Sequence, residues 1–227
     1  MRIIRRADSK SAALLVRLAD ASEVLRTSDF VLSWGVPAPG VFGGSVGLDG
    51  LQQLEAFKAT GIPCPEFTTE RPAPGDAASW WGRKRRHTQG RDICMLPVRP
   101  RGWRRSEFWV RPVTAQREFR VHIFDGLSIA RAEKVPANTL DATEAPPTCT
   151  LRRSRRFGWR LRHKCEMPDA VRDAAKRAVA ACGYSFGAVD VLWVNEAPVV
   201  LEVNRAPGLD TVTASAYIRA LEKKVTA

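Results

Sequence analysis

The spacing of apolar residues along the chain predicts helices mixed with short strands. In four segments apolar side chains recur three and four positions apart, which is typical of amphipathic helices. These segments are 11–25, 48–60, 167–182 and 213–224. In the third, Pro168 suits the first turn and Gly183 the stop after the last turn.

Runs of β-branched and aromatic residues predict strands between these helices. The runs cover 30–34, 80–83, 93–96, 108–113, 119–124 and 127–133. Asp125-Gly126, between the last two, is a strong signal for a tight hairpin turn. Because strands follow one another directly, the pattern favours an α+β fold with antiparallel sheets over a doubly wound parallel sheet.

The most informative pattern lies near the C-terminus and reads as two strands joined by a turn. The predicted strands are Val189–Val194 and Val199–Val203, with the turn at 195–198. Since side chains alternate along a strand, Glu202 and Asn204 should share one face, opposite Val199, Leu201 and Val203. If Val194 lies across from residue 198 or 199, Asp190 lies opposite or next to Glu202.

Two carboxylates facing each other across a sheet repel, and a hard cation between them removes that repulsion. Asp190, Glu202 and Asn204 are therefore candidate metal ligands. A plain amphipathic hairpin with a polar outer face explains the same pattern, and the spacing leaves both interpretations open.

Composition restricts the class of protein. The 227 residues are 44% hydrophobic, enough for one large or two small domains with a real core. No apolar run reaches the length of a membrane span, and the first residues do not resemble a signal peptide. The five cysteines are scattered without a CxxC pair, which disfavours zinc and a disulfide scaffold, so we expect a cytoplasmic protein.

The net charge of +12 predicts an anionic partner. Arginine and lysine gather in 83–91, 99–105 and 152–164, and several tryptophans lie beside arginines. Nucleotide phosphates, an acidic substrate and nucleic acid all fit such a surface, and so does a solvated basic face. Charge alone does not separate these possibilities.

Two further segments suggest a binding site. In 83–93 a basic strand end runs into a loop with Gly90, whose backbone N–H groups are suited to phosphate. Taken alone, the segment fits a solvated turn better than a phosphate loop, and the P-loop pattern is absent. In 117–124, Glu118, Arg120 and His122 share one strand face, and Lys134 ends the next strand. No Ser/His/Asp or Cys/His arrangement indicates a nucleophilic hydrolase.

Taken together, the segments from about Leu48 to Tyr217 resemble the ATP-grasp superfamily, especially small carboxylate–amine ligases similar to ribosomal-protein glutamate ligases and phage-encoded members. The resemblance is carried by FGAVDV…VLEVNRAPGL, REFRVHIFDG, GRKRRHTQGRDI and LQQLEAFKATGIPCPEF. It implies that Asp190, Glu202 and Asn204 bind Mg²⁺ on the phosphates of ATP. It also implies catalytic roles for Arg120 and Lys134, next to the transferred phosphoryl group.

The resemblance further implies a set of ATP-binding residues. They are Arg83, Lys84, His87, Gly90, Trp109, Arg111 and Glu118. The chain departs from the family in having Arg83, with Lys84 beside it, at the position of the usual phosphate-binding lysine, and Arg111 where an acidic or amide residue is common. The basic 152–164 segment with Trp159 is expected to shape the entrance for the acceptor.

The predicted architecture is an ATP-grasp fold in which two α+β subdomains with antiparallel sheets grip a nucleotide. We expect a reduced N-terminal α/β segment over 1–47, an N-terminal subdomain over 48–110 and a C-terminal subdomain with the metal site over 111–227. The predicted activity is ATP- and Mg²⁺-dependent ligation of a carboxylate to the amine of an amino acid or peptide. The alternative is a basic nucleic-acid-binding protein that keeps the scaffold without ligase turnover.

Overall fold

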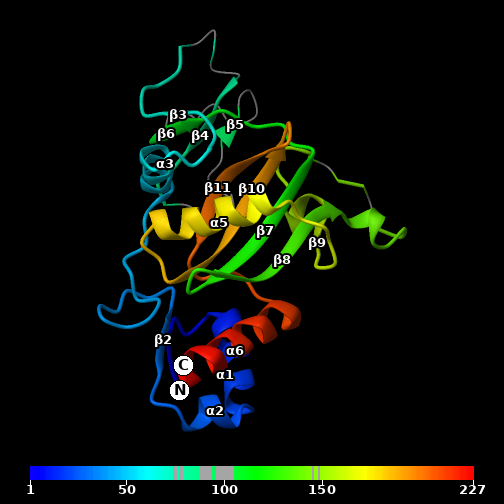
Figure 1. Ribbon diagram of the computed structural model, residues 1–227. Helices are drawn as coiled ribbons and strands as arrows, with labels where there is room; N and C mark the ends of the chain where they lie inside the picture. The colour runs from blue at the N-terminus through cyan, green and yellow to red at the C-terminus, as the bar shows by residue number, and fades with distance from the viewer. Residues whose placement is uncertain (74–75, 77–78, 87–93, 96–104, 145, 148) are drawn as a thin grey trace.

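A five-stranded antiparallel sheet forms the centre of the computed structural model (Figure 1). The structure describes residues 1–73, 76, 79–86, 94–95, 105–144, 146–147 and 149–227. The strand order is β11-β10-β7-β8-β9. The strands are β7 (Arg117–Phe124), β8 (Leu127–Pro136), β9 (Trp159–Arg162), β10 (Phe186–Val194) and β11 (Ala197–Asn204).

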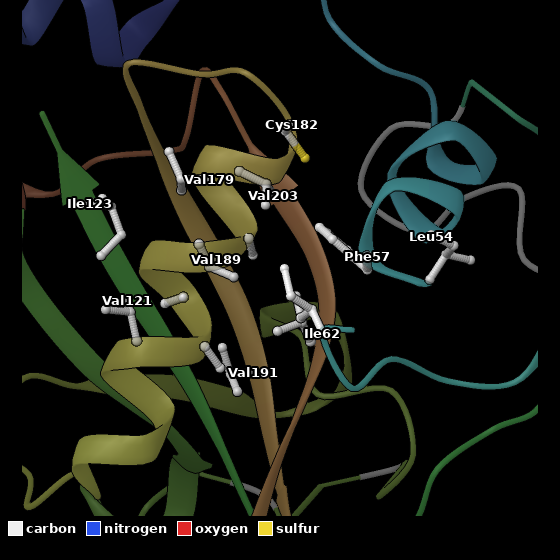
Figure 2. Close-up of a cluster of buried hydrophobic side chains, with 14 of the residues drawn as sticks. Leu54, Phe57, Ile62, Val121, Ile123, Val179, Cys182, Val189, Val191 and Val203 are labelled. Atoms are coloured by element: carbon white, nitrogen blue, oxygen red, sulfur yellow. The ribbon is translucent and has the colours of Figure 1, made fainter. Parts of the chain in front are cut away.

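One face of this sheet is covered by α5 (Asp169–Ala181) and forms the main core. Alternate residues of β7 and β10, including Val121, Ile123 and Val189, point at the helix and are fully buried. Phe57, from α3 (Gly50–Ala59), extends the same core (Figure 2). Because one face of β7 is committed to this core, its other face is free to carry polar side chains.

A smaller antiparallel sheet lies above the central sheet in the view of Figure 1. Its order is β3-β6-β4-β5. The strands are β3 (Phe67–Thr68), β4 (Trp81–Arg83), β5 (Cys94–Met95) and β6 (Phe108–Val110). The strands predicted near 80–83 and 93–96 are present as β4 and β5, and they pair with Trp81 opposite Met95.

The first and last elements of the chain pack together into a second core. It holds β1 (Arg2–Arg5) and β2 (Val31–Trp34), which pair in parallel, α1 (Lys10–Asp20), α2 (Glu23–Thr27) and α6 (Thr211–Thr226). Tyr217 and Leu221 of α6 are fully buried there, in one cluster with Leu15 and Trp34. The C-terminal helix therefore completes the core of the N-terminal segment; the predicted domain boundaries remain predictions.

The helix predicted over 11–25 is two helices. Ser9 and Ser22 each accept a backbone N–H from the residue three positions ahead, so each caps a separate helix. The other three predicted helices are confirmed as α3, α5 and α6. None of the helices in the described part of the chain combines the length and apolar character needed to cross a membrane.

The C-terminal hairpin is confirmed, but its turn is tighter than predicted. Only Asn195 and Glu196 link the strands, with φ of 46° and 62°, which defines a two-residue turn of the I′ kind. Val194 consequently lies opposite Ala197, rather than opposite residue 198 or 199. The predicted turn and register at this end of the hairpin were therefore wrong.

A β-bulge restores the predicted pairing further along the hairpin. Val191 faces Val200 while Asp190 faces Glu202, which leaves Leu201 as the extra residue. The bulge also reverses the faces of β11, so Val200 and Val203 are buried in the core while Leu201 is only half-buried. The expectation that Leu201 shares the apolar face of Val203 was therefore wrong.

Candidate functional site

Charged side chains gather on the face of the central sheet opposite α5. Asp190 in β10 lies between Arg120 in β7 and Glu202 in β11, and Cα pairing in both directions puts the three on one face. Glu118 and Lys134 come from β7 and β8 on the same side. The alternation expected for 117–124 is thus confirmed, with Phe119, Val121 and Ile123 fully buried on the core face.

Asp190 is the centre of this cluster. Arg120 donates from Nε to Oδ1 and from Nη2 to Oδ2, both at 2.8 Å, and Lys134 donates from Nζ to Oδ2 at 3.0 Å. Burial opposes ionisation of Asp190, but the charges and hydrogen bonds of the two cations outweigh it, so the pKa of Asp190 lies well below its usual value. The Asp190 charge in turn raises the pKa of Arg120. Both groups are therefore fixed in their charged forms.

Glu118 extends the cluster by accepting a short hydrogen bond from Lys134. Burial raises the pKa of Glu118, against the attraction of Lys134, and the nearby Asp190 charge raises it further. Burial disfavours the charge of Lys134, yet Asp190 and Glu118 together raise its pKa above the usual value. The cluster thus holds two cations and two acidic groups, all nearly buried except for part of Arg120.

The second part of the site joins the two sheets. Asn204 donates from Nδ2 to Glu202 Oε1 at 3.0 Å, and Arg83 Nη2 of β4 lies 3.9 Å from Glu202 Oε2. Burial lowers the pKa of Arg83, against the attraction of Glu202. Arg83, Glu202 and Asn204 therefore line the junction between the small sheet and β11.

The backbone of β11 is anchored at this junction by a buried glutamine. Gln53 of α3 accepts the N–H of Val203 at 2.8 Å and donates to the Val203 carbonyl at 3.2 Å. Val203 lies between Glu202 and Asn204 in the sequence. One side chain therefore fixes the peptide groups that position both candidate ligands.

The predicted metal ligands have the chemistry that a hard cation prefers, because all three offer carboxylate or amide oxygens. Glu202 is about one-third exposed, and among the described residues its Oε2 has the long contact with Arg83 alone. Both oxygens of Asp190 already accept hydrogen bonds from cations. Glu202 and Asn204 thus fit Mg²⁺ better than Asp190 does; within the described ranges no group of three or more His, Cys, Asp or Glu side chains could hold a metal.

The remaining predicted ATP-binding residues are spread over the small sheet. Trp109 is buried opposite Gly82, and Lys84 directly follows β4. Arg111 pairs with Glu66 at 2.9 Å and with Asp76 at 3.5 Å, so these carboxylates, and not the Asp190 cluster, hold it. His87 and Gly90 lie outside the described residues.

A cavity of about 530 Å³ opens beside the cluster, next to β8 and β9. Its lining residues are Arg120, Lys134, Leu140, Arg153, Ser154, Arg155, Trp159, Arg160, Leu161 and Asp210. The 152–164 segment was expected near the acceptor, but β9 was not predicted, because its four residues alternate Trp159 and Leu161 with arginines inside a strongly basic run. No sequence signal pointed to Asp210, the residue that caps α6.

The fold of this chain is similar to that of several solved structures. No known family model matches the sequence, and no curated protein does. D-alanine–D-alanine ligase from Bacillus anthracis matches with a TM-score of 0.66 at 12% identity, over 99% of this chain and 93% of that one. D-cycloserine synthetase DcsG matches with a TM-score of 0.60 at 15% identity, over 99% of this chain and all of that one.

The ATP-grasp ligase PsnB, solved with a minimal precursor, Mg and ADP, matches with a TM-score of 0.58 at 16% identity. That match covers 95% of this chain and 65% of PsnB. At these identities the likeness concerns the fold. The predicted fold class is confirmed: this chain shares the fold of these ATP-grasp ligases, with antiparallel sheets.

Proposed function

We propose that this protein is an ATP- and Mg²⁺-dependent ligase that joins a carboxylate to an amine through an acyl-phosphate. The observation that carries the proposal is the arrangement of Arg120 and Lys134 on Asp190, between the Glu202–Asn204 pair and an open cavity. The fold supports it, since the B. anthracis ligase was also solved with ATP and PsnB with Mg and ADP.

In this proposal the junction between the two sheets binds the nucleotide. Arg83 and Lys84 contact phosphate oxygens, with His87, Gly90, Trp109, Arg111 and Glu118 as the other predicted ATP contacts. Glu202 and Asn204 would hold the magnesium ion, while Asp190 keeps its hydrogen bonds to Arg120 and Lys134. Bound there, Mg²⁺ supplies positive charge that neutralises the phosphates and orients them for transfer.

The chemical steps need fixed positive charge more than they need a protein nucleophile. A carboxylate oxygen of the substrate attacks the γ-phosphorus of ATP, the bond to the bridging oxygen breaks, and ADP leaves. Arg120 and Lys134 stabilise the negative charge on the transferring phosphoryl group. The amine then attacks the acyl carbon, phosphate leaves, and the amine loses a proton as the amide forms.

Asp190 acts in these steps as a positioning residue. Its two oxygens hold the Arg120 fork and the Lys134 ammonium in one orientation, so no reorganisation is needed as charge develops. The amine acceptor in this proposal is an amino acid or a peptide.

Isothermal titration calorimetry with a non-hydrolysable ATP analogue tests the nucleotide site. We expect Glu202→Ala to abolish the Mg²⁺-dependent part of binding, because the remaining amide is a weak ligand by itself. Glu55→Ala, an exposed change on α3, is the matched control and should bind as the wild type does. Full Mg²⁺-dependent binding by Glu202→Ala would refute the assignment.

Turnover separates the ligase from the alternative function. Phosphate release from ATP is measured with pools of amino acids and short peptides, and binding of a single-stranded oligonucleotide is titrated with salt. Release that depends on a carboxylate and an amine supports the ligase. Oligonucleotide binding that falls steeply with salt, without any phosphate release, would instead support the nucleic-acid-binding alternative.

A further inference from the structure

The cavity beside the cluster carries a large excess of positive charge. Five of its lining side chains are cationic, namely Arg120, Lys134, Arg153, Arg155 and Arg160. Asp210 is the acidic side chain among the lining residues. An excess of positive charge in a cavity attracts anions. An anion binds most readily at a cation that has no acidic partner in the protein, so the ion pairs of the lining residues indicate where an anion would bind.

Several of these charges are already compensated. Arg120 and Lys134 are paired with Asp190 and Glu118, as described above. Arg160 Nη2 lies 2.7 Å from Glu144 Oε1, and Asp210 Oδ2 lies 2.7 Å from His163 Nε2. The two remaining cationic residues of the lining are Arg153 and Arg155.

Arg153 and Arg155 form no ion pair with any carboxylate in the described part of the chain. Arg153 is held over the Trp159 ring at 4.7 Å and donates to the carbonyls of Ala115 and Thr150. Burial lowers the pKa of Arg153, against the attraction of Glu118 and Glu133. A half-buried guanidinium that is held in place and has no carboxylate at ion-pair distance among the described residues is suited to bind an anion.

The order of strands separates this pair from the nucleotide end of the site. Glu202, Asn204 and Arg83 lie at the β11 edge of the central sheet, whereas Arg153 and Arg155 precede β9 at the opposite edge. Arg120 and Lys134, on β7 and β8, lie between the two. A ligand that reaches from Lys134 into the cavity therefore extends away from the proposed phosphates.

We infer that Arg153 and Arg155 form a second anion subsite, which accepts a second negatively charged group on the carboxylate substrate. The substrate class is thus a dicarboxylate or an acidic amino acid or peptide. One carboxylate lies at Arg120 and Lys134 and reacts; the other binds the arginine pair and does not react. The assignment of the reacting carboxylate rests on the proposed function, whereas the anion subsite does not.

Calorimetry without ATP tests the subsite directly, with malonate, succinate, glutarate and adipate as probes. Each diacid is compared with its monoamide, such as glutaramate for glutarate, in which an amide replaces one carboxylate and one negative charge remains. Ionic strength is held constant with NaCl. We expect one of the four dicarboxylates to bind at least about tenfold more tightly than its monoamide, the effect of one lost charge-assisted contact. Equal affinities for diacid and monoamide at every length would overturn the subsite.

Variants locate the binding. Arg155→Gln changes an exposed side chain and Arg153→Gln a half-buried one, and each should reduce the diacid preference about tenfold. Arg172→Gln is the matched control, because Arg172 lies on α5, across the sheet from the cavity, and pairs with Asp169. A diacid preference that survives both cavity variants would refute the assignment to these arginines.

Competition with the nucleotide separates this inference from the proposed function. The dicarboxylate should bind equally well with and without saturating Mg²⁺ and a non-hydrolysable ATP analogue. Mutually exclusive binding would mean that the arginines contact phosphates, which would refute the subsite while leaving the ligase proposal intact. Diacid binding in a protein that binds no ATP would refute the ligase proposal and leave the subsite standing.

Discussion

A single carboxylate, Asp190, holds two cations in the orientation that the proposed chemistry uses. Its oxygens accept three hydrogen bonds, two from Arg120 and one from Lys134. A buried ion cluster of this kind adds little net stability over an apolar core, but removing one member leaves its partners unpaired in a poorly solvated place. Substitution of Asp190 should therefore affect both the proposed catalysis and the stability of the fold.

We predict that Asp190→Ala lowers the free energy of unfolding by about 3–5 kcal/mol, because Arg120 and part of the Lys134 interaction lose their counter-charge. Urea unfolding followed by circular dichroism measures the change. Asp173→Ala, an exposed position on α5, serves as the control and should change stability by less than about 0.5 kcal/mol. A loss below about 1 kcal/mol for Asp190→Ala would contradict the ion cluster described here.

His122 gives the fold a measurable pH dependence. It is buried beside the hydroxyl of Tyr217, and burial together with the Arg120 charge lowers its pKa to about 4. Asp190 and Asp210 oppose this shift and His163 adds to it. Since the unfolded chain binds the histidine proton below about pH 6.5 and the folded chain does not, acid favours unfolding between these values.

The expected loss from this residue is about 2 kcal/mol between pH 7 and pH 5. Unfolding free energies measured at the two pH values for the wild type and for His122→Gln give the difference. The variant should lose correspondingly less on acidification, even where its stability at pH 7 is lower. An identical pH dependence in both proteins would show that His122 titrates normally in the folded state.

At the scale of elements, the hairpin of β10 and β11 depends on two local irregularities. The turn places Asn195 and Glu196 at positive φ, and the bulge at Leu201 brings Glu202 opposite Asp190. Glutamate is poorly suited to a left-handed position, where glycine is favoured. Replacing Glu196 by glycine should therefore stabilise the turn.

Glu196→Gly should raise the free energy of unfolding by about 0.5–1 kcal/mol, since relief of the positive φ exceeds the added freedom of the unfolded chain. Gly126→Ala makes the reciprocal test in the β7–β8 turn, where φ is 74° and nothing crowds an added methyl group. That variant should be destabilised by about 1 kcal/mol. Thermal unfolding monitors both, and changes of the same sign in the two variants would contradict the argument.

Periodicity in the sequence predicted most elements because their apolar faces are long and regular. The alternation of faces along β7, for example, was correctly predicted. The bulge was not predictable, because one extra residue changes no local composition and is fixed by how β11 pairs with β10. The pairing of Asp190 with Glu202 was nevertheless predicted, because the register assumed for a longer turn and the observed bulge both bring these two residues opposite each other.

The cavity could not have been found from sequence in the same way. It combines side chains from β7, β8, the segment before β9 and the cap of α6, which are far apart along the chain. Clustered arginines predict an anionic partner but not which of them are already paired. That distinction depends on the ion pairs of Arg160 and Asp210, which only the folded arrangement supplies.

At the scale of the whole molecule, the C-terminal helix packs against the N-terminal elements. Tyr217 and Leu221 of α6 are fully buried against the N-terminal elements, so residues 200 positions apart share one core. Ser22 at the start of α2 also donates to Glu222 at 2.6 Å. The N-terminal segment therefore depends on α6 for its apolar cover.

Leu221→Ala should destabilise the protein by about 2–5 kcal/mol through the cavity that it leaves. Hydrogen exchange followed by mass spectrometry should show the largest loss of protection in α1 and α6. Val179→Ala, in the core under α5, is the control and should act on α5 and the central strands instead. Equal loss of protection everywhere in both variants would mean that the two cores unfold as one unit.

The double hydrogen bond of Gln53 makes α3 and residues 202–204 one mechanical unit. Any rotation of α3 would be transmitted to Glu202 and Asn204, the proposed Mg²⁺ ligands, so α3 cannot move independently of them. A fluorophore on the outer surface of α3 would consequently report on events at Glu202.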